Sequence, residues 1–161
     1  MTEYTNTFVQ QKNGASALAC IAMVGNLNYD KLIEVYAGLA DEDANMYGIR
    51  HVLSTNNILN VAYLDPMMFG GRLYIINVPC LNIGGKLHTI IVDLRGEEPA
   101  IIDPNLGVDE LKVYSSVEDI RHYLNVLEVI ITPACEVQEH VDAPEVANAE
   151  VITFPTMETV Q

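Results

Sequence analysis

The sequence predicts a single α+β domain, in which N-terminal helices precede an antiparallel β-sheet. A chain of 161 residues with 50% hydrophobic residues is long enough to bury a core and is too apolar to be disordered as a whole. Residues 16–54 carry helix-like apolar patterns separated by glycine and asparagine. From residue 59 onward the pattern changes to short β-rich runs separated by turns.

Three helices are expected in the N-terminal part. The first spans residues 16–24, an apolar and Ala-rich run that ends at a Gly-Asn pair. The second spans residues 31–37 with Asn28 or Asp30 as its N-cap, because side-chain oxygens at that position accept from free backbone N–H groups. The third spans residues 47–54 and ends at an Asn-Asn turn.

Strands are expected to follow these helices. One more helix, from Ser116 or Asp119 through residue 124, is expected before the last strand. The expected strands are residues 59–64, 72–78, 87–94, 100–103 and 126–132.

The folded domain is expected to cover residues 1–132, and residues 133–161 are interpreted as an acidic C-terminal tail. Residues 122–161 contain no Lys or Arg. This composition is typical of a solvated, mobile terminus. Residues 151–154 nevertheless have strand propensity, so docking on the domain or self-association through the tail by strand addition is the alternative.

The net charge of −14 argues against binding to nucleic acid or to an anionic membrane surface, because both need clustered Lys and Arg. No apolar run approaches the roughly 20 residues that span a bilayer, and the N-terminus lacks the pattern of a signal peptide. We therefore expect a cytoplasmic protein, or a virion-associated one if it is encoded by a phage, with no membrane partner.

The three cysteines are widely spaced and form no CxxC pair, so they predict neither a zinc site nor a disulfide framework. Cys20 lies in the first helix and Cys80 at a strand end, and both are interpreted as small buried hydrophobic residues. Cys135 falls in the tail. The acidic residues 41–43 lack the spacing of a calcium loop. We expect no metal and no cofactor.

The segment around Ser16 carries the strongest functional signal. Gln10 lies six residues before Ser16, and Ser16 opens the first helix. A nucleophile at a helix N-terminus benefits from the positive end of the helix dipole, which stabilises a developing anion. A glutamine upstream can donate its amide to that oxyanion.

His88 and Asp103 are the candidate base and its orienting carboxylate. His88 follows a Gly-Gly turn at the start of a strand, and Asp103 ends the next strand. Adjacent antiparallel strands can bring the two side chains within hydrogen-bond reach, as in nucleophile–His–Asp triads. The alternative interpretations are a packed core histidine and an Asx-type turn of Asp103 with Asn105 and Gly107.

Taken in order, these motifs resemble the papain-like cysteine peptidases, and most closely the bacteriocin-processing C39 type with its free-standing relatives in bacteria and phages. The resemblance covers about residues 8–132 and implies a papain-like fold and hydrolysis of peptide or amide bonds in a peptide or protein substrate. It implies Ser16 at the nucleophile position, His88 as base, Asp103 as orienter and Gln10 as oxyanion donor, with no cofactor.

The chain departs from that family pattern at two positions. Ser16 stands where the family has cysteine, and Ala17 where it has glycine. Ser16 is then an engineered knockout, a natural loss, or the nucleophile of a serine hydrolase, since a hydroxyl is far less nucleophilic than a thiolate. Aligning on Gln11 would put Ala17 at the nucleophile position. The alternative function is an inactive pseudopeptidase that serves as a binding or structural module, for example in a phage particle.

Overall fold

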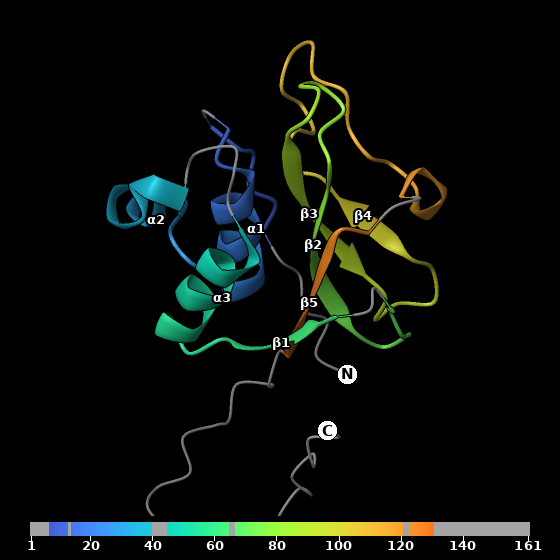
Figure 1. Ribbon diagram of the computed structural model, residues 1–161, viewed down its shortest axis with the longest axis horizontal. Helices are drawn as coiled ribbons and strands as arrows, with labels where there is room; N and C mark the ends of the chain where they lie inside the picture. The colour runs from blue at the N-terminus through green and yellow to red at the C-terminus, as the bar shows by residue number, and fades with distance from the viewer. Residues whose placement is uncertain (1–6, 13, 40–44, 65–66, 121–122, 131–161) are drawn as a thin grey trace, which may run out of the picture.

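The computed structural model describes residues 7–12, 14–39, 45–64, 67–120 and 123–130. Within them three helices precede a five-stranded antiparallel sheet, which confirms the expected α+β class (Figure 1). The helices are α1 (Ser16–Gly25), α2 (Tyr29–Val35) and α3 (Met46–Thr55), with a 3-10 turn, η1 (Ala37–Leu39), after α2. The strands are β1 (Leu59–Tyr63), β2 (Leu73–Pro79), β3 (Leu87–Asp93), β4 (Ala100–Ile102) and β5 (Asn125–Ile130).

The sheet has the strand order β1-β5-β2-β3-β4, and all neighbouring pairs are antiparallel. Ile75 in the central strand β2 lies opposite Ile91 of β3 on one side and Leu127 of β5 on the other. β2 and β3 are almost completely buried, in keeping with the mostly apolar residues of both strands. The helices gather on one face of this sheet (Figure 1).

Two hydrophobic cores lie on the two faces of the sheet. In the first, α1 is buried along residues 16–24 and packs between the other helices and β3. A helix that is apolar all round has to be enclosed in this way. In the second, Tyr114 and Ile120 cover the opposite face of the sheet, over Tyr74 and Ile90.

Asparagine caps begin the two outer helices. The Asn28 side chain accepts a hydrogen bond from the Lys31 backbone N–H at 2.9 Å, so Asn28 is the cap of α2 rather than Asp30. The Asn45 side chain accepts from the Gly48 N–H at 2.9 Å at the start of α3. Each bond satisfies a backbone donor that a helix leaves unpaired in its first turn.

Replacing the cap of α3 is expected to destabilise the domain measurably. Asn45→Ala removes the acceptor for the Gly48 N–H, and we expect a loss of about 1 kcal/mol in the free energy of unfolding, measured by urea denaturation. Asn45→Asp keeps an acceptor at the same place and is the matched control. Equal stability of the two variants would contradict a role for this cap.

The helix expected over residues 116–124 is wrong. In place of this helix the structure has one 3-10 turn, η2 (Val117–Asp119), and Ile120 is already outside it. The Asp119 carboxylate accepts from the Ser116 N–H at 3.1 Å and closes the turn, after which Ile120 is buried in the second core. Residues 121–122 lie outside the described residues, as does the expected tail over 133–161.

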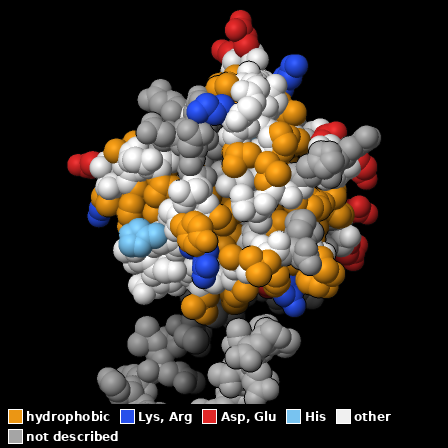
Figure 2. Space-filling view, in the orientation of Figure 1, with side chains coloured by type: hydrophobic (Ala, Val, Ile, Leu, Met, Phe, Trp, Pro, Cys, Tyr) orange, Lys and Arg blue, Asp and Glu red, His pale blue; other side chains and the backbone are white. Residues whose placement is uncertain are grey.

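The surface of the described residues mixes apolar and charged areas. Figure 2 shows hydrophobic side chains over much of the middle of the viewed face and acidic side chains mainly at its rim. Edge strand β1 exposes Leu59 and Val61. Among the described residues, no helix combines the length and the hydrophobicity needed to cross a membrane.

Candidate active site

Ser16 is the first residue of α1 and lies against the start of β3. Its side chain is buried, with 7% exposure, and its hydroxyl oxygen accepts a hydrogen bond from the Thr89 backbone N–H at 3.2 Å. The preceding Ala15 is the N-cap and supplies no side-chain acceptor to the helix. The backbone donors of the first turn and the positive end of the helix dipole are therefore directed toward the region around Ser16.

The structure brings His88 and Asp103 together. His88 is the second residue of β3, and Asp103 follows β4, which pairs with β3 through Ile91 and Ile102. The His88 Nε2 atom lies 2.7 Å from the Asp103 Oδ1 atom, and the two residues are only 5% and 2% exposed. This is the hydrogen bond that the strand order predicted.

The Asp103 carboxylate is held by the backbone as well as by His88. Its Oδ1 atom accepts from the Asn105 N–H and its Oδ2 atom from the Tyr114 N–H, each at 2.8 Å. The Asx-type turn and the orienting contact to His88 therefore coexist. A fixed carboxylate fixes the orientation of the imidazole, and the His88 Nδ1 atom has no hydrogen bond within the described residues.

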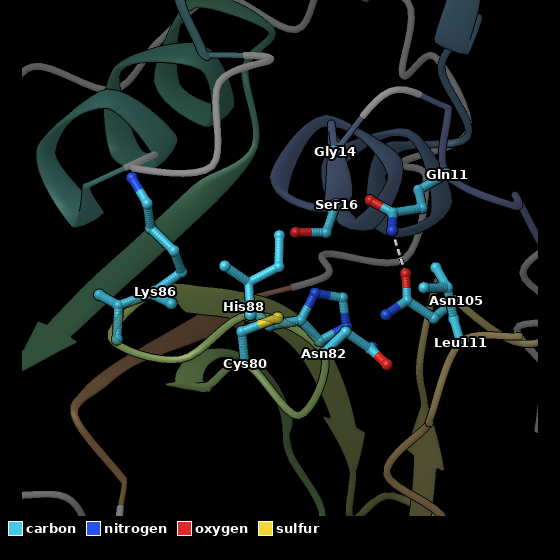
Figure 3. A pocket seen from close by; sticks show the side chains of 11 residues that line it. Gln11, Gly14, Ser16, Cys80, Asn82, Lys86, His88, Asn105 and Leu111 are labelled. Atoms are coloured by element: carbon cyan, nitrogen blue, oxygen red, sulfur yellow. Dashed lines mark hydrogen bonds between the residues drawn. The ribbon is translucent and has the colours of Figure 1, made fainter.

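A pocket of about 240 Å³ lies between Ser16 and His88. In Figure 3 the imidazole lies below the Ser16 side chain, and both border this space. No direct hydrogen bond joins these two described residues. One part of the pocket wall is apolar and consists of Ile83, Leu87 and Leu111.

The two neighbouring glutamines occupy different places. Gln10, the predicted oxyanion donor, is exposed, and its amide donates to the Leu106 carbonyl at 3.3 Å. Gln11 borders the pocket instead, because its backbone N–H donates to the Pro104 carbonyl at 2.9 Å and holds the segment beside the Asp103 turn. The structure thus places Gln11, rather than Gln10, at the pocket that Ser16 borders (Figure 3).

The Gln11 amide is held by Asn105 but is only partly satisfied. Its Nε2 atom donates to the Asn105 Oδ1 atom, while its buried Oε1 atom has no hydrogen-bond partner among the described residues. A half-turn of this amide exchanges its donor and acceptor ends. The N–H₂ group would then take the place of the unpartnered oxygen.

Asn105 is a pocket residue that sequence reasoning did not assign to the site. It is 2% exposed and borders the pocket, with its amide between Gln11 and His88 in Figure 3. Its Oδ1 atom accepts from Gln11, and its Nδ2 donor is not used by any described residue. The Asp-Pro-Asn sequence could have indicated a place for Asn105 at the site, because Asn105 lies in the turn that positions Asp103.

A comparison of the chain with protein-family models gives no match, and a comparison with curated proteins gives no significant match. The resemblance to C39-type peptidases therefore stays a prediction from the residues of the site and their order along the chain.

The two described cysteines differ from each other. Cys20 is fully buried, as expected, and burial raises the pKa of its thiol well above the usual value. The expectation for Cys80 is wrong, because Cys80 is partly exposed and borders the pocket. Cys80 directly follows β2. The strand ends at the pocket, and the residues after it no longer enter the core. The described part of the chain contains no group of three or more His, Cys, Asp or Glu side chains arranged for a metal ion.

Proposed function

We propose that this protein is a papain-like, C39-like hydrolase of peptide or amide bonds, with Ser16 at the nucleophile position. One observation carries the proposal: a buried His88–Asp103 pair, with 2.7 Å between Nε2 and Oδ1, shares a pocket with a side chain at the N-terminus of a buried helix. This combination provides a nucleophile position, a base and an orienter on three separate elements, as acyl-transfer sites require.

The proposed reaction begins with transfer of the Ser16 hydroxyl proton to the His88 Nδ1 atom. The Ser16 oxygen attacks the carbonyl carbon, and Asp103 stabilises the imidazolium through its bond to Nε2. His88 then protonates the leaving amine as the C–N bond breaks. Water hydrolyses the resulting ester by the same proton transfers, which releases the acid and restores the hydroxyl group.

Several donors could hold the carbonyl oxygen during this reaction. The Asn105 Nδ2 atom and the first turn of α1 both adjoin the pocket. After the half-turn described above, the Asn105 Nδ2 atom would donate to the Gln11 Oε1 atom, and the Gln11 amide would be the donor at the pocket in place of Asn105. We propose Gln11 and Asn105 for this role beside Gln10, because they line the pocket, whereas Gln10 bonds to Leu106 outside it.

The pocket supports a short, partly apolar peptide as substrate. A volume of about 240 Å³ is small and suits one side chain with the bond beside it. Ile83, Leu87 and Leu111 favour an apolar side chain there. The net charge of −14 favours a neutral or basic peptide over an acidic one, since it repels anions.

A second candidate function is that of an inactive pseudopeptidase that binds peptides without cleaving them. The Ser16 oxygen accepts the Thr89 N–H, a contact that reduces its electron density, and it has no hydrogen bond to His88. A hydroxyl in that state is a poor nucleophile. A binding or structural role in the cytoplasm or in a phage particle would follow.

Incubation with a mixture of proteolytic peptides separates these functions, with new N-termini identified by mass spectrometry. We expect Ser16→Cys to cleave at least about tenfold faster than wild type, because a thiol ionises beside histidine far more readily than a hydroxyl. Ser16→Ala and Ser16→Cys/His88→Ala are the controls and should not cleave. Cleavage by wild type but not by Ser16→Ala supports a serine hydrolase, and cleavage by Ser16→Cys alone supports the pseudopeptidase. No cleavage by any folded variant would contradict a hydrolase site.

A further inference from the structure

We propose that Cys80 is a reactive thiol of this pocket, which His88 deprotonates and which accepts an acyl group from an activated ester. The proposal rests on the role of His88 as base in the proposed function, but not on any reaction of Ser16. It concerns a cysteine on the β2–β3 hairpin, on a different element from the nucleophile position of α1.

The strand register places Cys80 beside His88. Val78 lies directly opposite His88 in the β2–β3 pair, and the Cys80 N–H donates to the Lys86 carbonyl at 2.8 Å, which continues the pairing beyond β2. Because side chains alternate between faces, Cys80 lies on the same face as Val78 and His88. Cys80 and His88 are then diagonal neighbours, a relationship with a backbone separation of roughly 7–8 Å that longer side chains bridge.

Both side chains open into the same space. Cys80 and His88 both border the pocket, and Figure 3 draws both side chains among its lining residues. Cys80 is partly exposed and reachable by a ligand in the pocket, unlike Cys20. His88 is 5% exposed, and its Nδ1 atom has no hydrogen-bond partner within the described residues. A buried imidazole with one free nitrogen can accept the thiol proton.

The thiol has a chemical advantage over the hydroxyl in the same pocket. A cysteine thiol is a few per cent ionised at neutral pH without assistance and is intrinsically more nucleophilic than a serine hydroxyl. The Ser16 oxygen also accepts the Thr89 N–H at 3.2 Å, whereas no described residue donates to the Cys80 sulfur. Of the two candidate nucleophiles in this pocket, Cys80 therefore has the more reactive side chain.

The proposed step is balanced in atoms and protons. The Cys80 proton passes to His88, and the thiolate attacks the carbonyl carbon of the acyl group. The bond to the leaving oxygen breaks as His88 gives the thiol proton to that oxygen, which leaves a thioester on Cys80 and a neutral His88. Water, deprotonated by His88, then attacks the thioester carbon, the acid is released, and the sulfur regains its proton from His88.

p-Nitrophenyl acetate is the probe for this proposal, with acetylated residues located by mass spectrometry after short reaction times. We expect acetylation of Cys80 in the wild-type chain, at a rate reduced roughly tenfold or more by His88→Gln. Cys80→Ser should lose most of the fast nitrophenolate release. Cys20→Ser is the matched control and should react like wild type, because Cys20 is fully buried.

The outcomes separate this inference from the proposed function. Acetyl on Ser16 but not on Cys80 overturns the inference and supports the hydrolase at Ser16. Acetylation of Cys80 at the same rate in folded His88→Gln also overturns it, since the thiol would then be merely exposed. Acetyl on neither residue overturns it as well, and the peptide experiment above then decides the proposed function by itself.

A second measurement needs no variant and is independent of whether His88→Gln folds. We expect iodoacetamide to alkylate Cys80 at pH 6 roughly tenfold faster in the native protein than in the urea-unfolded chain, where no imidazole assists it. A native rate equal to or below the unfolded rate would overturn the proposal.

Discussion

The Ser16→Cys variant is expected to carry a thiol that reacts with iodoacetamide at pH 5.5 roughly tenfold faster than an ordinary thiol, or more. At this pH an unassisted thiol is almost entirely protonated. A thiol at position 16 would lie at the N-terminus of α1 and beside the His88 imidazole, and both stabilise a thiolate. The gain in thiolate outweighs the lower intrinsic nucleophilicity of a more acidic thiol.

The site of alkylation is identified by mass spectrometry, and Cys20 provides an internal reference within the same chain. Burial raises the pKa of Cys20, so it should stay unmodified in the folded protein. We carry the measurement out in a Cys80→Ser background, so that the pocket contains a single thiol. His88→Ala should remove the advantage. A rate at position 16 that does not depend on His88 would argue against a catalytic pair and for a binding site.

The Asp103→Ala variant is expected to lose about 3–5 kcal/mol of unfolding free energy, because it breaks a buried network and leaves its partners unpaired. Asp103 is 2% exposed and accepts hydrogen bonds from His88 and from the Asn105 and Tyr114 backbones. Removal of the carboxyl group leaves three buried donors without an acceptor. Urea denaturation followed by circular dichroism measures the loss.

Asp93 is the matched control for this prediction, since it ends β3 and pairs with Arg95 near the surface. Burial of Asp93 opposes ionisation, but hydrogen bonds and charge from Arg95 outweigh it and lower the pKa of Asp93 below 3.8. The stabilising contribution of Asp93 is therefore present above this pH and is lost as the pH falls below it. At pH 7, Asp93→Ala should lose at most about 1 kcal/mol. Equal losses for the two variants would contradict a special role of Asp103.

The elements that could be predicted are those whose sequences carry a local signal. Residues 16–24 form α1 because they are apolar without interruption, and the strand runs at 72–78 and 87–94 became β2 and β3 with shifts of one residue at the ends. The helix expected over 116–124 failed for a tertiary reason. Its apolar Ile120 fits helical spacing, but the second core requires it in an extended segment that covers the sheet.

The contact between His88 and Asp103 could be predicted because it depends only on the order of two adjacent strands. The places of Gln11 and Asn105 could not, because they depend on the Gln11 N–H bonding to the Pro104 carbonyl across more than 90 residues of chain. Counting six residues back from Ser16 selects Gln10, and no local pattern shows which of two adjacent glutamines turns inward. The partial exposure of Cys80 likewise follows from where the hairpin ends.

The enclosure of α1 has a consequence for how such a protein can change over evolutionary time. Every residue from Ser16 to Val24 is buried, so the place of the side-chain atom at position 16 is set by the packing of the domain. Exchange of oxygen for sulfur at position 16 alters one atom and leaves the surrounding framework as it is. Under the proposed function, a lineage built on this framework can therefore change between a hydrolase and a peptide-binding protein by single substitutions at position 16, in either direction.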